Sequence, residues 1–255
     1  MGRTLAPAAG ARQSRRCDGI GASVVELATR GCSPPRGFAD SVRPLKDSYH
    51  HGALREALVV AATALVEEGG ADSFSLRDAA RTVGVTPSAT YRHFENKGAL
   101  LTAVAAAGVE RLGKRMHRQL ASAQRREGSP RAVATESFRD TCRAYCAFAL
   151  QHPAIYRVMY GPAGLHELSR SCAEGVHGPH RILGSALDGL VTAGLLSKAR
   201  RSGAEFRAWT VLHGFSTQVL DGVPAFSSAA KRTEALEDLL DFTVEGLLGR
   251  SAPRS

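Results

Sequence analysis

The sequence lacks any apolar run of the roughly 18 residues that a membrane-spanning helix needs. The longest candidate, residues 99–109, is too short and rich in alanine. The beginning of the chain, MGRTLAPAAGARQSRRC, also lacks the apolar core of a secretory signal peptide. We therefore expect no membrane partner.

Cysteine is scarce and odd in number, with five residues in a chain of 255. Without a secretory leader, such usage indicates reduced thiols and a cytoplasmic protein. Neither a CxxC nor an HExxH spacing is present, and a metal ion needs three or four converging ligands. We expect no metal site, although two groups of potential ligands occur: Cys142 with Cys146, and His166, Cys172, His177 and His180.

Motifs of catalysis are also missing. The chain has no glycine-rich phosphate loop, no nucleophile elbow and no evident pair of catalytic carboxylates. The sequence therefore predicts no catalytic residue, no cofactor and no enzyme. A redox sensor acting through Cys172 stays open as an alternative to a purely incidental thiol.

What the sequence has instead is alanine and leucine in helical patterns. Few β-branched residues alternate at period two, and no strand-turn-strand pattern is found. These features predict an all-α fold. A length of 255 residues is enough for one large helical domain or for two domains that share a core.

The chain is basic, with a formal net charge of +9 and a pI near 9.8. This surplus favours a polyanionic partner, although solubility alone also explains it. Residues 1–47 hold eight Lys and Arg against four acids (+4), and residues 48–97 hold five against six (−1). The segment 48–97 is therefore no basic stripe, so any phosphate contacts would depend on hydroxyls, a few cations and helix N-termini.

The most informative stretch is SLRDAARTVGVTPSATYRHFENK, which runs from Ser75 to Lys97. Ser75 is a good N-cap for a short helix that Gly84 ends. Thr86 and Pro87 then provide an N-cap and a first helical residue for a second helix, which we expect to reach about Phe94. Two short helices joined by such a turn match the helix-turn-helix, whose second helix reads base edges in the DNA major groove.

An ordinary buried helical hairpin would show the same two helices. The second helix argues against it, because only Ala89 and Phe94 are apolar there. Its other side chains are polar, which predicts that most of the helix faces solvent or a polar partner: Thr86, Ser88, Thr90, Tyr91, Arg92 and His93.

A third helix precedes this unit, with Leu54, Leu58, Ala61 and Leu65 on one face and an end at Gly69 and Gly70. Phe74 is placed to fill the core between the three helices. We accordingly divide the chain into a basic extension at 1–47, a DNA-binding domain at 48–97 and a helical domain at 98–250. The extension, rich in Gly, Pro, Ser, Ala and Arg, is expected to be a disordered arm or an untranslated start, with non-specific DNA binding as the functional alternative.

Residues 49–101 resemble the DNA-binding domain of the TetR family of bacterial transcriptional regulators. The resemblance rests on the helix ending in EEGG, the segment SLRDAARTVGV, the Thr-Pro start, Tyr-x-His-Phe, and a lysine that opens a fourth helix. It implies an all-helical homodimeric repressor with an N-terminal DNA-binding domain and a C-terminal ligand-binding and dimerisation domain. It also implies DNA contacts by Arg77, Thr86, Pro87, Ser88, Ala89, Tyr91, His93 and Lys97.

The chemistry of these residues supports some of the implied contacts. Arg77 can bind a guanine bidentately, and the small Ser88 and Ala89 let the helix approach the bases closely. Arg92 stands where the family tolerates many residues, so it can serve a base or a phosphate. For His93, an internal hydrogen bond that fixes the helix end is the alternative role.

After Lys97 the chain continues as a long helix to about Leu120, and its arginines indicate a solvated face. Further helices follow from about Pro130, and one of them ends at His152 and Pro153. We expect the last two helices to form a four-helix bundle with those of a second copy. A ligand cavity in this domain is predicted to be lined by Phe138, Tyr145, Met159, Tyr160, Phe206 and Trp209.

The resulting hypothesis is a repressor that an unidentified small-molecule effector releases from a double-stranded DNA operator. Its two recognition helices would enter successive major grooves, about 34 Å apart. The alternative is a dimeric ligand-binding or redox-sensing helical protein without operator recognition.

Overall fold

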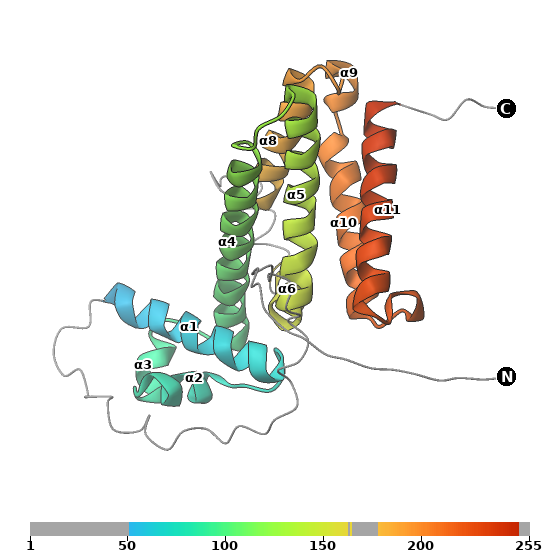
Figure 1. Ribbon diagram of the computed structural model, residues 1–255. Coiled ribbons are helices and arrows are strands. Elements are labelled where there is room, and N and C mark those ends of the chain that lie inside the picture. The colour runs from blue at the N-terminus through green and yellow to red at the C-terminus, as the bar shows by residue number, and fades with distance from the viewer. Residues whose placement is uncertain (1–50, 163, 165–177, 250–255) are drawn as a thin grey trace, which may run out of the picture. The chain divides into compact units, whose positions relative to one another are not determined.

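A computed structural model describes residues 51–162, 164 and 178–249 (Figure 1). Regular structure in this part of the chain is helical throughout, which confirms the predicted all-α fold. The elements are α1 (His51–Gly69), α2 (Leu76–Val83), α3 (Pro87–Tyr91), α4 (Lys97–Ala123), α5 (Pro130–Gln151), α6 (Pro153–Tyr160), α8 (Pro179–Thr192), α9 (Lys198–Arg201), α10 (Ala204–Leu220), the 3-10 helix η1 (Pro224–Phe226) and α11 (Ala229–Leu248). The extension predicted at 1–47 lies outside the described residues.

Local signals set the ends of α1 and α2 as the sequence predicts. The chain leaves α1 through Gly70, whose φ of 84° belongs to the left-handed region that glycine adopts without strain. The hydroxyl of Ser75 accepts from the Asp78 amide, and the Asp78 carboxylate accepts from the Ser75 amide, so α2 begins with a complete capping box. Gly84, at φ 77°, ends α2.

Helix α3 is shorter than predicted, because it ends at Tyr91 rather than near Phe94. The amides of His93 and Phe94 both donate to the Thr90 carbonyl, so the chain tightens into turns after Tyr91. Phe94 is 2% exposed and Asn96 caps α4 through a 2.9 Å bond from the Ala99 amide. Asn96 has the extended backbone of an N-cap, which a continuing helix cannot contain, so the chain leaves α3 in the turns that carry Phe94 into the core.

A small apolar core supports the first three helices. Leu58 of α1, Leu76 of α2 and Phe94 are buried in one cluster with Phe74. Phe74 is 4% exposed, which confirms its predicted place in this core. Thr90 is fully buried, so this polar residue occupies the inner side of α3 while most of the other polar side chains of the segment face outward.

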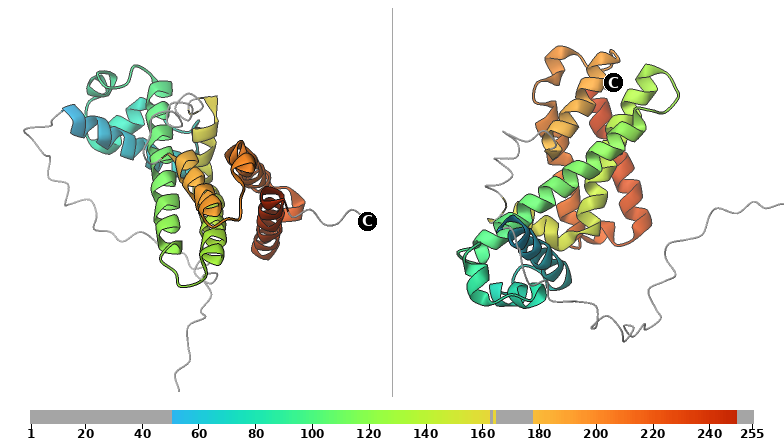
Figure 2. Two further views of the ribbon diagram at one scale, coloured as in Figure 1. Left: turned by 90° about the horizontal axis from the view of Figure 1, so that it is seen from above. Right: turned by 90° about the vertical axis from the view of Figure 1, so that its left-hand side faces the viewer.

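Helix α4 connects this three-helix unit to the remaining helices. It packs against α1, α5, α6 and α8, and Figures 1 and 2 show it leaving the α1–α3 unit and running beside α5. Helices α10 and α11 pack against each other and against α5. The long fourth helix predicted from Lys97 is therefore confirmed.

A network of ion pairs joins α5 to α11. Arg143 donates to both carboxylate oxygens of Glu237, each at 2.7 Å, and to Asp140 at 2.7 Å. Arg139 donates to Glu237 at 2.8 Å and also pairs with Asp241. Hydrogen bonds from Arg143, followed by those from Arg139, hold the pKa of Glu237 at about 2, below its usual 4.5.

Replacing Glu237 by glutamine is expected to lower the free energy of unfolding at pH 7 by about 1–2 kcal/mol, a range reduced from buried-pair values because Glu237 is a third exposed. Its folded-state pKa is depressed, so the stabilisation is complete above pH 4.5 and is lost as the pH falls towards 2. Urea unfolding at pH 7 and at pH 3 measures both effects.

Glu234→Gln, an exposed change one turn earlier on α11, is the matched control and is expected to leave stability unchanged. A difference between Glu237→Gln and the original protein that is equally large at pH 3 and pH 7 would contradict the role assigned to the ionised carboxylate.

Candidate functional site

The N-terminal tip of α3 is small, polar and directed outward. The Thr86 hydroxyl accepts from the Ala89 amide at 3.4 Å and lies 3.0 Å from the Ser88 hydroxyl. Thr86, Pro87 and Ser88 are all exposed, and Tyr91 is 53% exposed at the other end of the helix. Because Thr90 and Phe94 fix the inner side, this outer side is held rigidly and is open to a partner.

The other predicted DNA-contact residues differ in their exposure and in their contacts with the protein. Arg77 and Arg92 are exposed, whereas Ala89 and His93 are half-buried. The Lys97 ammonium donates to the Asp72 carbonyl at 3.2 Å and lies 5.1 Å from the centre of the Phe74 ring. Lys97 is thus anchored to the loop before α2, although an ammonium has three donors and can serve a second acceptor.

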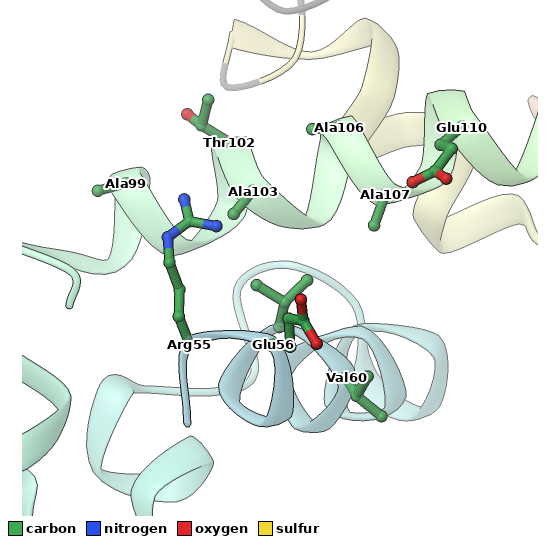
Figure 3. Close-up of a pocket in the computed structure, with 10 residues that line it drawn as sticks. Arg55, Glu56, Val60, Ala99, Thr102, Ala103, Ala106, Ala107 and Glu110 are labelled. Atoms are coloured by element: carbon green, nitrogen blue, oxygen red, sulfur yellow. The ribbon is translucent and has the colours of Figure 1, made fainter. Parts of the chain in front are cut away.

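A groove of about 650 Å³ is lined by residues of both α1 and α4. Four alanines, Thr102 and Glu110 form its α4 side, and Arg55, Glu56 and Val60 of α1 lie opposite (Figure 3). The groove contains none of the predicted site residues. Val60 is 70% exposed on the α1 side.

A polar cluster ties α1 to the helices that follow α4. The Glu67 carboxylate lies 3.0 Å from an Arg111 nitrogen and 2.9 Å from Nδ1 of His152, while His152 Nε2 is 3.1 Å from Arg111. Arg115 donates to Gln151 at 2.6 Å. The arginines of α4 are therefore not simply a solvated face as predicted, since these two bind neighbouring elements.

A glycine allows α4 and α6 to approach each other closely. A Cβ atom at Gly108 would lie 2.8 Å from both Ile155 Cγ2 and Met159 Sδ. Met159, one of the predicted ligand-binding residues, is fully buried. Helix α6 therefore packs directly against the backbone of α4 at Gly108.

Aromatic side chains from four helices form a cluster in the C-terminal part of the chain. The Tyr145 ring lies 4.9 Å from Trp209 and 6.1 Å from Tyr156, and the Tyr160 ring lies 4.4 Å from His213. His180 stacks on Trp209 at 3.7 Å. We call these six residues, Tyr145, Tyr156, Tyr160, His180, Trp209 and His213, the aromatic cluster.

The structure brings together only part of the predicted ligand-binding set. Tyr145, Tyr160 and Trp209 meet in the aromatic cluster, and Phe138 is fully buried on α5. Phe206 is 74% exposed, so it does not belong to the same internal surface. Helical periodicity placed it on the side of Trp209, but α10 turns that edge towards solvent.

Sequence reasoning left Tyr156, His180 and His213 out of the ligand-binding set. A signal was available for two of them, because Tyr156 with Tyr160 and Trp209 with His213 are spaced i, i+4, which puts each pair on one helix face. That the two faces meet could not be read from either helix alone.

Three half-buried imidazoles predict a pH dependence of stability. Burial lowers the pKa of His152, His180 and His213, and Arg111 lowers that of His152 further. Unfolded imidazoles bind protons near pH 6.5 and the folded ones only at lower pH, so the free energy of unfolding is expected to fall from pH 7 to pH 5. Urea unfolding across this range measures it.

Removing one of these imidazoles tests whether the histidines cause the pH dependence of stability. His180→Phe keeps a ring against Trp209 and is expected to flatten the slope of stability against pH. If this slope were unchanged, or if the protein became more stable on acidification from pH 7 to pH 5, the three histidines would not control stability in this pH range.

The cysteines in the described part of the chain are unreactive. Cys142 and Cys146 are buried and free, and burial raises the pKa of both thiols, that of Cys146 to about 12. No group of three or more potential ligands there could hold a metal ion. His166, Cys172 and His177 lie outside the described residues, as does the redox alternative that depends on Cys172.

Two large apolar side chains lie exposed on the last two long helices. Phe206 of α10 is 74% exposed and Phe242 of α11 is 68% exposed. Among the helices in the described residues, none is long and apolar enough to cross a lipid bilayer.

These features define the class of protein. Two short helices with a glycine turn, a capped second helix with an outward polar tip and a supporting third helix make up a helix-turn-helix unit, here joined to a larger helical body. Proteins of this class use the exposed helix to read the major groove of DNA.

Comparison with known families supports this class of protein. Residues 58–104 match the family "Bacterial regulatory proteins, tetR family", and residues 138–243 match "Tetracyclin repressor-like, C-terminal domain". The chain belongs to the TetR family of transcriptional regulators.

Solved structures show the same fold. A protein of unknown function from Rhodococcus sp. RHA1 is 27% identical, with a TM-score of 0.63 over 80% of this chain and 100% of the other. A TetR/AcrR-family transcriptional regulator from Thermobifida fusca is 21% identical, with a TM-score of 0.53 over 75% and 97% of the two chains. RolR, solved with its ligand resorcinol, is 16% identical, with a TM-score of 0.55 over 80% and 97%. A search of curated proteins found no match.

Proposed function

We propose that this TetR-family regulator is a homodimeric repressor that binds a double-stranded DNA operator and is released from it by a small-molecule effector. The observation that carries the proposal is the outward, polar tip of α3, held by buried Thr90 and Phe94. A helix supported in this way can enter a major groove without rearranging.

The proposed contacts divide into base readout and positioning. Arg77 is assigned to a base or a phosphate, and Ser88 and Ala89 allow close approach to the bases. Tyr91, His93 and Lys97 are assigned to phosphates, and Arg92 to a base or a phosphate. Thr86 is assigned to a contact with the DNA backbone, and Pro87 to the groove-facing tip beside Ser88 and Ala89. The family implies this set, and the exposure of Arg77, Ser88, Tyr91 and Arg92 supports it.

The proposed dimer interface is the outer surface of α10 and α11. Exposed Phe206 and Phe242 support it, because each would gain stability by being covered in a bundle of four helices. Two recognition helices related by such a twofold axis would bind half-sites about 34 Å apart.

Effector release requires that the ligand bind two arrangements of the DNA-reading units unequally. The proposed effector site is in the C-terminal helices, where Tyr145, Tyr160 and Trp209 meet. The close α4–α6 contact at Gly108 and the Glu67–Arg111–His152 cluster supply physical links from there to α1 and α4. Binding rather than turnover is the proposed activity.

Selection from random DNA, followed by fluorescence anisotropy on the enriched sequence, tests operator recognition. We expect a palindromic site bound about a thousandfold or more tightly than unrelated DNA at physiological salt. Weak binding that is independent of sequence and disappears with salt would favour a ligand-binding dimer without an operator.

A further inference from the structure

A small pocket lies where α6 meets the C-terminal end of α10. Its volume is about 240 Å³. It includes residues of the aromatic cluster but no member of the predicted ligand-binding set except Tyr160. The lining residues are Tyr156, Arg157, Tyr160, Gly161, His213, Thr217, Leu220 and Asp221.

Flat rings form part of the pocket wall. The rings of Tyr156 and Tyr160 are 4.6 Å apart, and those of Tyr160 and His213 are 4.4 Å apart, each pair tilted by more than 45°. Such rings offer both their π faces and their edges. Another aromatic ring prefers these contacts, because it can stack on a face or meet an edge. An aromatic ligand would thus gain more than a saturated one of equal size.

Hydrogen bonds in the cluster fix which nitrogen of His213 can serve a ligand. The Tyr156 hydroxyl lies 2.7 Å from Nδ1 of His213, so this ring nitrogen is engaged within the cluster. Tyr145 donates to the Tyr160 hydroxyl at 3.0 Å. Nε2 is therefore the ring nitrogen left for a ligand, and it carries the proton of the neutral imidazole when Nδ1 accepts from Tyr156.

The charges at this pocket cancel. Arg157 donates to the Leu220 carbonyl at 2.7 Å and lies 3.4 Å from the Asp221 carboxylate. Burial lowers the pKa of His213, which keeps the imidazole uncharged at neutral pH. An uncharged ligand therefore meets no unpaired charge, whereas an anion would be opposed by Asp221 as much as it is attracted by Arg157.

The volume limits the ligand to about one ring. An engineered cavity of about 150 Å³ accepts benzene, whereas drug-sized ligands occupy pockets of about 300–1,000 Å³. At about 240 Å³, the pocket has room for a single ring with one or two polar substituents.

We propose that this pocket binds a neutral, single-ring hydroxyaromatic molecule, with phenol as the simplest member of the class. The ring contacts Tyr156, Tyr160 and His213, and the phenolic oxygen accepts a hydrogen bond from Nε2–H of His213. The role of this ligand as the effector rests on the proposed function, whereas its binding does not.

The single tryptophan of the chain reports on this site. Trp209 lies 6.3 Å from the Tyr160 ring and 4.9 Å from the Tyr145 ring. Phenol is titrated into the full chain while tryptophan is excited at a wavelength that phenol and tyrosine do not absorb. We expect a saturable change with phenol and at least tenfold weaker binding of cyclohexanol and of benzoate. Equal binding of phenol and cyclohexanol would overturn the proposal.

Three variants locate the binding. His213→Phe keeps a ring and removes the donor, so phenol is expected to bind at least tenfold more weakly. Thr217→Phe fills the pocket while leaving the imidazole in place, and is expected to abolish binding. Gln218→Phe adds the same ring at the exposed neighbouring position, which does not line the pocket, so it is the matched control and should bind phenol as the original protein does.

The stability of each variant is measured by urea unfolding, so that a misfolded protein is recognised. If folded His213→Phe and Thr217→Phe both bind phenol normally, the site is wrong. Anisotropy on the selected operator then separates the two proposals. Phenol that binds without releasing DNA supports the pocket and overturns its role as the effector site, whereas a chain that recognises no operator leaves the pocket proposal intact.

Discussion

The Arg77→Ala homodimer is expected to bind its selected operator about 30-fold to more than a thousandfold more weakly than the original protein. A bidentate contact between arginine and guanine contributes about 1–3 kcal/mol, and a twofold-symmetric complex loses it at both half-sites. Arg77 is exposed at the first turn of α2, where its truncation removes no buried contact. Fluorescence anisotropy at fixed salt measures the loss.

Arg81→Ala provides the matched control on the same helix. Arg81 is also exposed, but its guanidinium pairs with Asp78, and we expect less than a threefold change in affinity. Comparison of the operator with unrelated DNA then shows what Arg77 contacts. A loss confined to the operator indicates a base, an equal loss on both indicates a phosphate, and no loss on either removes Arg77 from the interface.

The Phe242→Glu protein is expected to be monomeric and to bind the operator on the order of a hundredfold to ten-thousandfold more weakly. A charge in the middle of an apolar interface opposes association, and a monomer loses the second half-site that multiplies affinity. Phe242 is 68% exposed on α11, so the substitution leaves the core of one protomer unchanged. Sedimentation velocity measures the oligomeric state and anisotropy the affinity.

Val60→Glu tests whether the effect is specific to α11. Val60 is 70% exposed, as Phe242 is, but it lies on α1, which packs against α2, α4 and α6. This variant is expected to remain a dimer. If Phe242→Glu also remained a dimer with full affinity, the interface between protomers would have to lie on another surface.

The helix-turn-helix unit could be predicted almost completely because its signals are local. The capping box at Ser75, the left-handed Gly84 and the Thr86–Pro87 start are each decided within four residues of the chain. The end of α3 was placed too late because it depends on Phe94 turning into a core made with α1. Residues distant in sequence form that core, so no local pattern records it.

The proposed effector region could be predicted much less completely, because it depends on contacts between helices. Trp209 and Phe206 stand three residues apart on one helix and were predicted to line the same cavity, yet one joins the aromatic cluster and the other faces solvent. Periodicity gives the apolar side of a helix but not the neighbour that covers it. The meeting of Tyr156 and His213 has the same origin, since their contact joins α6 to α10.

The amino-acid sequence by itself determined the helices, most of their ends and the polar character of the recognition helix, because hydrogen bonds and caps within a few residues decide them. Tertiary structure alone decided that Thr90 is buried, that Arg111 binds Glu67, and that an imidazole of α10 lies between tyrosines of α5 and α6. These outcomes depend on which helix faces lie against each other, and the energy of such packing comes from contacts between residues far apart in the chain.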